Sequence, residues 1–114
     1  MRHAVIVEAA RTPVGRAHPE KGIFRDVRAD DLSADLMTAL LKRSGVAASD
    51  VEDVHWGCVK QQGEQGYDVA RMAALIAGLP IEVAGVTVNR NCGSRLASES
   101  NAWWACANCS RSRP

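Results

Sequence analysis

Cys92 is the residue of this chain whose type and position most directly suggest chemistry. It follows a strand-like run, residues 85–89, and precedes Gly93 and Ser94, where a helix can begin. Unpaired N–H groups and the dipole at the start of a helix favour thiolate, the form of cysteine that attacks carbonyl carbons. The same N–H groups can stabilise a developing oxyanion, and Gly93 would let a carbonyl approach closely. Cys92 is therefore a candidate nucleophile, with a small buried hydrophobe as the alternative.

The other cysteines and the histidines carry weaker signals. We expect Cys58, within a strand-like run, to be a buried and inert thiol. His3 is expected at the terminal surface, His18 in a polar loop and His55 in a strand as a satisfied structural histidine. None of the three histidines is predicted to be catalytic.

Cys106 and Cys109 have CxxC spacing, but this spacing alone does not predict a metal or redox site. A structural zinc site needs about four ligands, and no second pair follows. A redox CxxC opens a helix after a strand, which this pair does not. The sequence therefore predicts no metal site, and without an export signal all four cysteines are expected to be free thiols.

The elements that would position Cys92 alternate between strands and helices. Short aliphatic or alternating runs predict strands, and apolar residues at helical spacing predict helices. The expected order is strand 4–10, a helix after Asp30, strand 53–59, helix 69–77, strand 85–89 and a helix starting near residue 92. Such alternation indicates an α/β fold with a mostly parallel sheet, in which ligands bind at the carboxyl ends of the strands.

Two helices carry clear boundary signals. The first is expected to be capped by Asp30 or Asp31 and to end at Gly45. Its predicted core stripe consists of Leu32, Leu36, Met37, Leu40 and Leu41. Asp68 is expected to cap the second helix, and Gly78 and Pro80 to end it.

Size and charge exclude several functions. A length of 114 residues allows one small domain, and a net charge of +1 gives no reason to expect nucleic acid or an anionic membrane as a partner. The apolar run at residues 4–7 is stopped by Glu8, too early for a signal segment or a spanning helix. A cytoplasmic location is therefore expected.

Several ordered motifs over residues 4–94 resemble the thiolase family. The opening, residues 5–15, looks like the start of thiolases, and residues 86–94 look like their nucleophile motif. Asp30-Asp31-Leu32, Trp56-Gly57-Cys58-Val59 and Gln65-Gly66 resemble the bacterial 3-ketoacyl-CoA thiolase of the fatty-acid oxidation complex. The resemblance implies the N-terminal part of a thiolase-like α/β fold, incomplete here, with Cys92 as the acyl-accepting nucleophile.

The resemblance also implies a reaction. Cys92 would attack the 3-keto carbon of a 3-ketoacyl-CoA, acetyl-CoA would leave, and free CoA would release the shortened acyl group from the thioester. No metal or cofactor is implied, since coenzyme A is a substrate. Family members are homo-oligomers or pair with the alpha subunit of the oxidation complex. The family's activating histidine, second cysteine and thioester-binding histidine or asparagine come from later parts of a longer chain and match no position here.

Residues 95–114 are expected to differ in origin from residues 1–94. Arg95 stands where the resemblance implies a small residue, and the last twenty residues contain no valine, isoleucine or glycine. The tail consists largely of arginine, serine, alanine, tryptophan and cysteine and ends in proline, the residue types that GC-rich coding DNA tends to give in a wrong reading frame. We therefore expect an aberrant, frameshifted tail, and reading the gene in its other frames would test this.

Two alternative functions remain open from the sequence. The chain could be a non-catalytic truncated fragment or a module that joins subunits, in which case Cys92 would react no faster than Cys106 and Cys109. A condensing enzyme of fatty-acid synthesis would share the fold and the nucleophile position. The Arg11-Thr12-Pro13 and Trp56-Gly57-Cys58 stretches favour the degradative thiolase over this reading.

Overall fold

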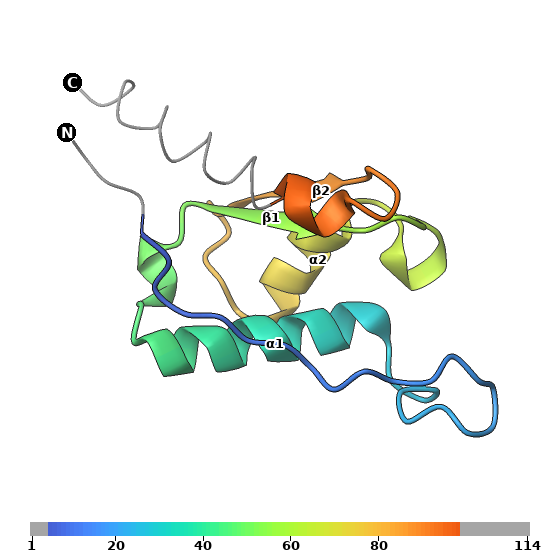
Figure 1. Cartoon of the computed structure of the whole chain (residues 1–114). Coiled ribbons are helices and arrows are strands. Elements are labelled where there is room, and N and C mark those ends of the chain that lie inside the picture. The colour runs from blue at the N-terminus through green and yellow to red at the C-terminus, as the bar shows by residue number, and fades with distance from the viewer. Residues whose placement is uncertain (1–4, 99–114) are drawn as a thin grey trace.

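The computed structural model describes residues 5–98 and contains two strands and two α-helices in an alternating order (Figure 1). The chain runs through α1 (Ala29–Ser44), β1 (Asp53–Gly57), α2 (Val69–Ile76) and β2 (Ala84–Val88). Short 3-10 turns lie at Ala48–Asp50 and Gly63–Gln65, and residues 94–98 are helical. The predicted α/β alternation is confirmed, and in these residues no helix is long and apolar enough to cross a membrane.

The two strands form a parallel sheet with helices on both of its faces. β1 pairs with β2 in the register Val54 to Gly85 and Gly57 to Val88. Successive strand residues point to opposite faces, so Gly57 and Gly85 belong to different faces. α2 packs against both strands on the Gly85 face, and α1 packs on the outer side of α2 (Figure 1). The helical residues 94–98 contact the Gly57 face.

Small residues allow α2 to lie close to the sheet. Ala70, Ala73 and Ala74 of α2 are fully buried, and each contributes only a methyl group as its side chain. A Cβ on Gly85 would lie 2.7 Å from the backbone nitrogen of Arg71 in α2. Ala74 continues into a cluster with Leu79 and Val83 that forms the centre of the core.

The start of α2 is tied to the strand that leads toward Cys92. Asp68 is the N-cap residue, as predicted, but its side chain makes no capping bond. Its Oδ1 instead accepts a hydrogen bond from the Thr87 hydroxyl of β2, and the Thr87 Oγ1 accepts the backbone N–H of Ala70 at 3.1 Å. A strand residue thus supplies the cap that the helix lacks locally, which fixes α2 against β2.

The start of α1 differs from the prediction. The helix begins at Ala29 with Arg28 as its N-cap residue, so Asp30 lies within the first turn and does not cap it. The Asp30 carboxylate is engaged by the Arg28 guanidinium at 2.7 and 3.0 Å. Glu64, 35 residues away, accepts the N–H of Ala29 at 2.9 Å. A tertiary contact has replaced the local cap, which sequence spacing alone could not indicate.

The other end and the inner face of α1 agree better with expectation. Gly45 adopts the left-handed conformation, with φ of 71°, and its N–H bonds the Leu41 carbonyl. Of the five stripe residues, Met37 is buried and the four leucines are half-buried. Ser33 and Ala34 are buried as well, so the covered face is rotated toward small residues that allow α2 to approach.

Acid should weaken the fold through Asp30. Hydrogen bonding to Arg28 lowers the pKa of the Asp30 carboxyl from its ordinary value. A folded-state pKa below the unfolded one contributes stability that is present above about pH 4 and is lost as pH falls through the folded pKa. We expect the urea midpoint to fall between pH 5 and pH 3 by less in Asp30→Asn than in the wild type. Equal falls in both proteins would contradict this assignment.

The strand predicted for residues 4–10 is wrong for the described part of this segment. Residues 5–10 are extended but belong to no sheet, and Val5, Ile6 and Val7 are 75%, 92% and 63% exposed. An aliphatic run becomes a strand only when a neighbouring edge accepts its backbone hydrogen bonds, and no such pairing occurs within residues 5–98. Glu8 instead holds the segment beside α1 through an ion pair with Arg43 at 3.1 Å.

Candidate active site

Cys92 lies in the connection between β2 and the helical residues 94–98, and its side chain is exposed. β2 ends at Val88, whose carbonyl accepts the N–H of Cys58 at 3.0 Å and extends the strand pairing by one bond. The connection therefore begins at the carboxyl edge of a parallel sheet, where α/β proteins place their ligands. The sequence prediction located Cys92 at this strand–helix junction, and the structure confirms that position.

The backbone around Cys92 forms a tight turn that uses its own donors. Asn91 has a positive φ of 49°. The N–H of Gly93 donates to the Arg90 carbonyl at 3.0 Å, and that of Ser94 donates to the Asn91 carbonyl at 3.1 Å. The expectation that the N–H groups after Cys92 stand open for an oxyanion is therefore wrong for Gly93 and Ser94, because the turn itself engages them.

Ser94, expected in the first helical turn, also makes two side-chain hydrogen bonds that the sequence did not predict. Its side chain is buried, accepts the N–H of Arg90 at 2.8 Å and donates to the Asn91 carbonyl at 2.7 Å. One hydroxyl thus joins the residues on the amino side of Cys92 to the helical turn on its other side. Serine often hydrogen-bonds to nearby backbone groups in turns, so its presence at position 94 is too general a signal to predict these two partners.

Ser94→Ala should loosen this turn. The substitution removes both hydrogen bonds and leaves the N–H of Arg90 and the carbonyl of Asn91 without the Ser94 hydroxyl. We expect a loss of about 1–2 kcal/mol in the free energy of unfolding. Amide exchange at Arg90 should also accelerate, as measured by NMR.

Ser98→Ala is the matched control for that measurement. Ser98 is equally buried, but among residues 5–98 its hydroxyl makes one hydrogen bond, to the Arg95 carbonyl at 2.7 Å. We expect a smaller loss of stability and no change in exchange at Arg90. Equal effects of the two substitutions would show that Ser94 has no special role in the turn.

Two further residues fix the turn to β1 and to the segment that follows it. The Asn89 side chain donates to the Val59 carbonyl at 2.9 Å and accepts the N–H of Asn91 at 3.0 Å. Gly57 lies directly beneath the helical residues, because a Cβ at this position would be 2.7 Å from the Ser94 carbonyl carbon and 2.8 Å from the Arg95 nitrogen. The turn that carries Cys92 therefore packs directly against the backbone of Gly57 in β1, with no side chain between them.

The remaining candidates lie apart from the Cys92 thiol. Cys58 is buried, as predicted, and its Sγ donates to Gln65 Oε1 at 3.2 Å. His18 accepts the N–H groups of Glu20 and Lys21 through Nδ1, both at 3.1 Å, within a loop. Neither histidine of the described segment, His18 or His55, is hydrogen-bonded to Cys92.

His55 differs from the prediction in one respect. Its side chain is buried within β1, and its Nε2 lies 3.1 Å from Asp53 Oδ2. Within residues 5–98, however, neither ring nitrogen has a hydrogen bond of acceptable geometry. Within the described residues the ring is therefore approached by the Asp53 carboxylate but lacks the hydrogen bond expected of a satisfied structural histidine.

Several predictions fall outside the described residues. These are the positions of His3, Cys106 and Cys109 and most of the expected tail, residues 99–114. Among residues 5–98, no group of three or more histidine, cysteine, aspartate or glutamate side chains could hold a metal ion.

The parallel sheet covered by helices places the chain among the α/β proteins, with an exposed cysteine at the carboxyl edge of the sheet. Comparison with known sequences defines the family. Residues 4–110 match the family described as thiolase, N-terminal domain. The chain belongs to the thiolase family. The match extends past residue 94, and the proposed boundary between residues 94 and 95 stays a prediction.

Three proteins to which the chain is similar are each named 3-ketoacyl-CoA thiolase. A relative from Vibrio vulnificus is 56% identical over 97 residues, which cover 84% of this chain and 24% of the relative. One from Aliivibrio fischeri is 54% identical with the same coverage. One from Idiomarina loihiensis is 51% identical over 109 residues, or 95% of this chain and 28% of the relative. The chain thus spans about a quarter of the length of these curated relatives.

Proposed function

We propose that Cys92 is the acyl-accepting nucleophile of a 3-ketoacyl-CoA thiolase, an acyltransferase of fatty-acid β-oxidation in the cytoplasm. The observation that supports this most strongly is the exposed thiol on a braced turn at the carboxyl edge of a parallel sheet. The family assignment and the shared name of its relatives support the substrate class.

The proposed chemistry has two steps. The Cys92 thiolate attacks the 3-keto carbon, the bond between C2 and C3 breaks, and its electron pair leaves on acetyl-CoA, which then takes up a proton. The thiol of free CoA attacks the resulting acyl thioester and loses its proton as the Cys92 thiolate departs. Both steps need a proton donor or acceptor beside the sulfur. The described residues provide none that is hydrogen-bonded to Cys92.

We therefore expect the 114-residue chain by itself to show no catalytic turnover. A CoA-consumption assay with a short 3-ketoacyl-CoA should give the same background rate for the purified chain and for Cys92→Ser. Turnover of the wild type above that variant would overturn this part of the proposal and would call for a proton donor that the described residues do not supply.

A non-catalytic role is the second candidate, favoured by the engaged N–H groups of Gly93 and Ser94. In this case the chain would serve as a subunit-interaction module, within a homo-oligomer or with the alpha subunit of the oxidation complex. Alkylation by iodoacetamide at neutral pH separates the two candidates. Fast labelling of Cys92 relative to Cys106 and Cys109 supports the nucleophile, and equal slow labelling supports the module.

A further inference from the structure

The aliphatic run Val5-Ile6-Val7 is an extended segment with no strand beside it. All three side chains are exposed, Ile6 most of all. Within residues 5–98 their backbone N–H and C=O groups make no hydrogen bond to the protein. Extended β-branched residues with free backbone groups on an accessible edge form a template for pairing with another strand. The run therefore has the properties of an unpaired edge strand.

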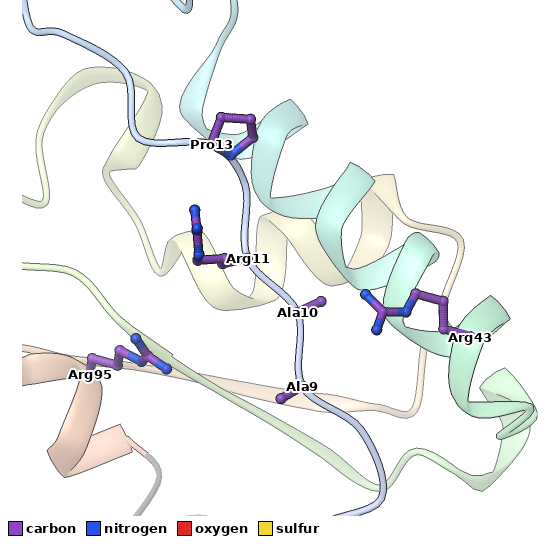
Figure 2. Close-up of a pocket in the computed structure, with 6 residues that line it drawn as sticks. All are labelled: Ala9, Ala10, Arg11, Pro13, Arg43 and Arg95. Atoms are coloured by element: carbon purple, nitrogen blue, oxygen red, sulfur yellow. The ribbon is translucent and has the colours of Figure 1, made fainter.

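Contacts with α1 hold this segment in place. Glu8, the next residue, forms an ion pair with Arg43 of α1 at 3.1 Å. The chain then continues alongside α1 as far as Pro13, with Arg43 reaching toward it (Figure 2). Proline has no N–H and so limits how far a pairing could extend in this direction. A segment that is already held extended loses less conformational entropy when it pairs.

The order of the side chains suits pairing with a second copy of this chain. Val-Ile-Val reads the same in both directions. An antiparallel pair centred on Ile6 would place the Ile6 residues of the two copies opposite each other and each Val5 opposite a Val7. Such cross-strand pairs of β-branched residues stabilise a sheet. The contact uses the same patch on both copies and closes as a twofold dimer.

The neighbouring charges favour the antiparallel direction. In an antiparallel pair centred on Ile6, the two Glu8 residues would stand four positions apart, or about 13 Å along the strands. In a parallel pair in equal register, each Glu8 would face the other Glu8 and each Arg11 the other Arg11. Like charges directly opposite each other are destabilising. The charges therefore select a closed antiparallel dimer over an open parallel stack.

We propose that residues 5–7 of two copies of this chain pair as antiparallel strands about a twofold axis at Ile6. The dimer is independent of acyl transfer, because it uses no residue of the turn that carries Cys92. A two-stranded pairing of this length is weak. The dimer therefore forms reversibly and depends on the protein concentration.

Sedimentation equilibrium of the full 114-residue chain tests this interface, over a hundredfold range of concentration and with a reductant that prevents disulfide cross-links. We expect a reversible monomer–dimer equilibrium in the wild type. Ile6→Lys should raise the Kd of the dimer by about tenfold or more, because two ammonium groups would face each other. Ile81→Lys is the matched control, since it places the same charge at another exposed isoleucine, and it should change the Kd by less than about twofold. A monomeric wild type, a dimer that persists in Ile6→Lys or an equal effect of the two substitutions would overturn the proposal.

Mixing two charge variants tests the symmetric register. Ile6→Glu alone should be as monomeric as Ile6→Lys, whereas an equimolar mixture of the two should recover a dimer that contains one chain of each, because opposite charges then face each other. Circular dichroism should show the same helix content in all variants, since position 6 is exposed. A mixture that stays monomeric would contradict the pairing about Ile6 and would indicate that the run contacts a different edge of the second copy.

Discussion

Replacing Gly57 by alanine should displace the turn that carries Cys92. The added Cβ would lie 2.7 Å from the Ser94 carbonyl carbon and 2.8 Å from both the Ser94 oxygen and the Arg95 nitrogen. These are backbone atoms, so no change of rotamer can relieve the contact, and either β1 or the helical residues must move. Overpacking of this kind costs about 1–3 kcal/mol, and we expect a value near the upper end.

The result should be visible both in stability and at the turn. Urea unfolding would report the loss of free energy, and amide exchange at Arg90 and Ser94 would report the loosened turn. Gly93→Ala is the control, because its Cβ would come no closer than 3.4 Å, to the Arg90 carbonyl oxygen. A Gly57→Ala protein as stable as Gly93→Ala would contradict the close packing of the turn on β1.

Gly85→Ala should cost a similar amount on the opposite face of the sheet. Its Cβ would lie 2.7 Å from the backbone nitrogen of Arg71 and 2.8 Å from the Arg71 Cα. α2 would be pushed away from the strands, and the bond from Ala70 to the Thr87 hydroxyl would lengthen. We expect a loss of about 2–3 kcal/mol with a marked loss of helix content.

Ala84→Val provides the comparison for that variant. It adds carbon atoms to the same strand at an exposed position, where a β-branched residue suits a strand. Stability should stay within about 0.5 kcal/mol of the wild type. If Gly85→Ala behaved like Ala84→Val, the close approach of α2 to the sheet would be incorrect.

The bounds of β1, α2 and β2 could be predicted from the sequence. β1, α2 and β2 begin and end within two residues of their predicted bounds, because local periodicity and the Asp68 and Gly78 signals agree with the packing. Residues 5–10 could not be predicted in the same way. Their aliphatic character shows that they suit a strand, but pairing depends on an edge that another part of a chain must offer.

The candidate site was predictable in position but not in its hydrogen bonding. The position of Cys92 follows from the predicted strand–helix junction. The contacts that brace its turn do not follow from local sequence, because they join residues that are far apart in the chain or on opposite sides of the turn. They are made by the Ser94 hydroxyl, the Asn89 side chain and the Gly57 backbone. The cap of α1 was missed for the same reason, since Glu64 reaches Ala29 across 35 residues.

The most direct test of the account is the site of acyl transfer from a simple thioester. The purified chain would be incubated with a short acyl-CoA near neutral pH, and intact mass and peptide mapping would identify the acylated cysteine as CoA departs. We predict acylation of Cys92 first, none on the buried Cys58, and none at position 92 in Cys92→Ser. Acylation of Cys106 and Cys109 at the same rate as Cys92 would contradict its role as the acyl-accepting nucleophile.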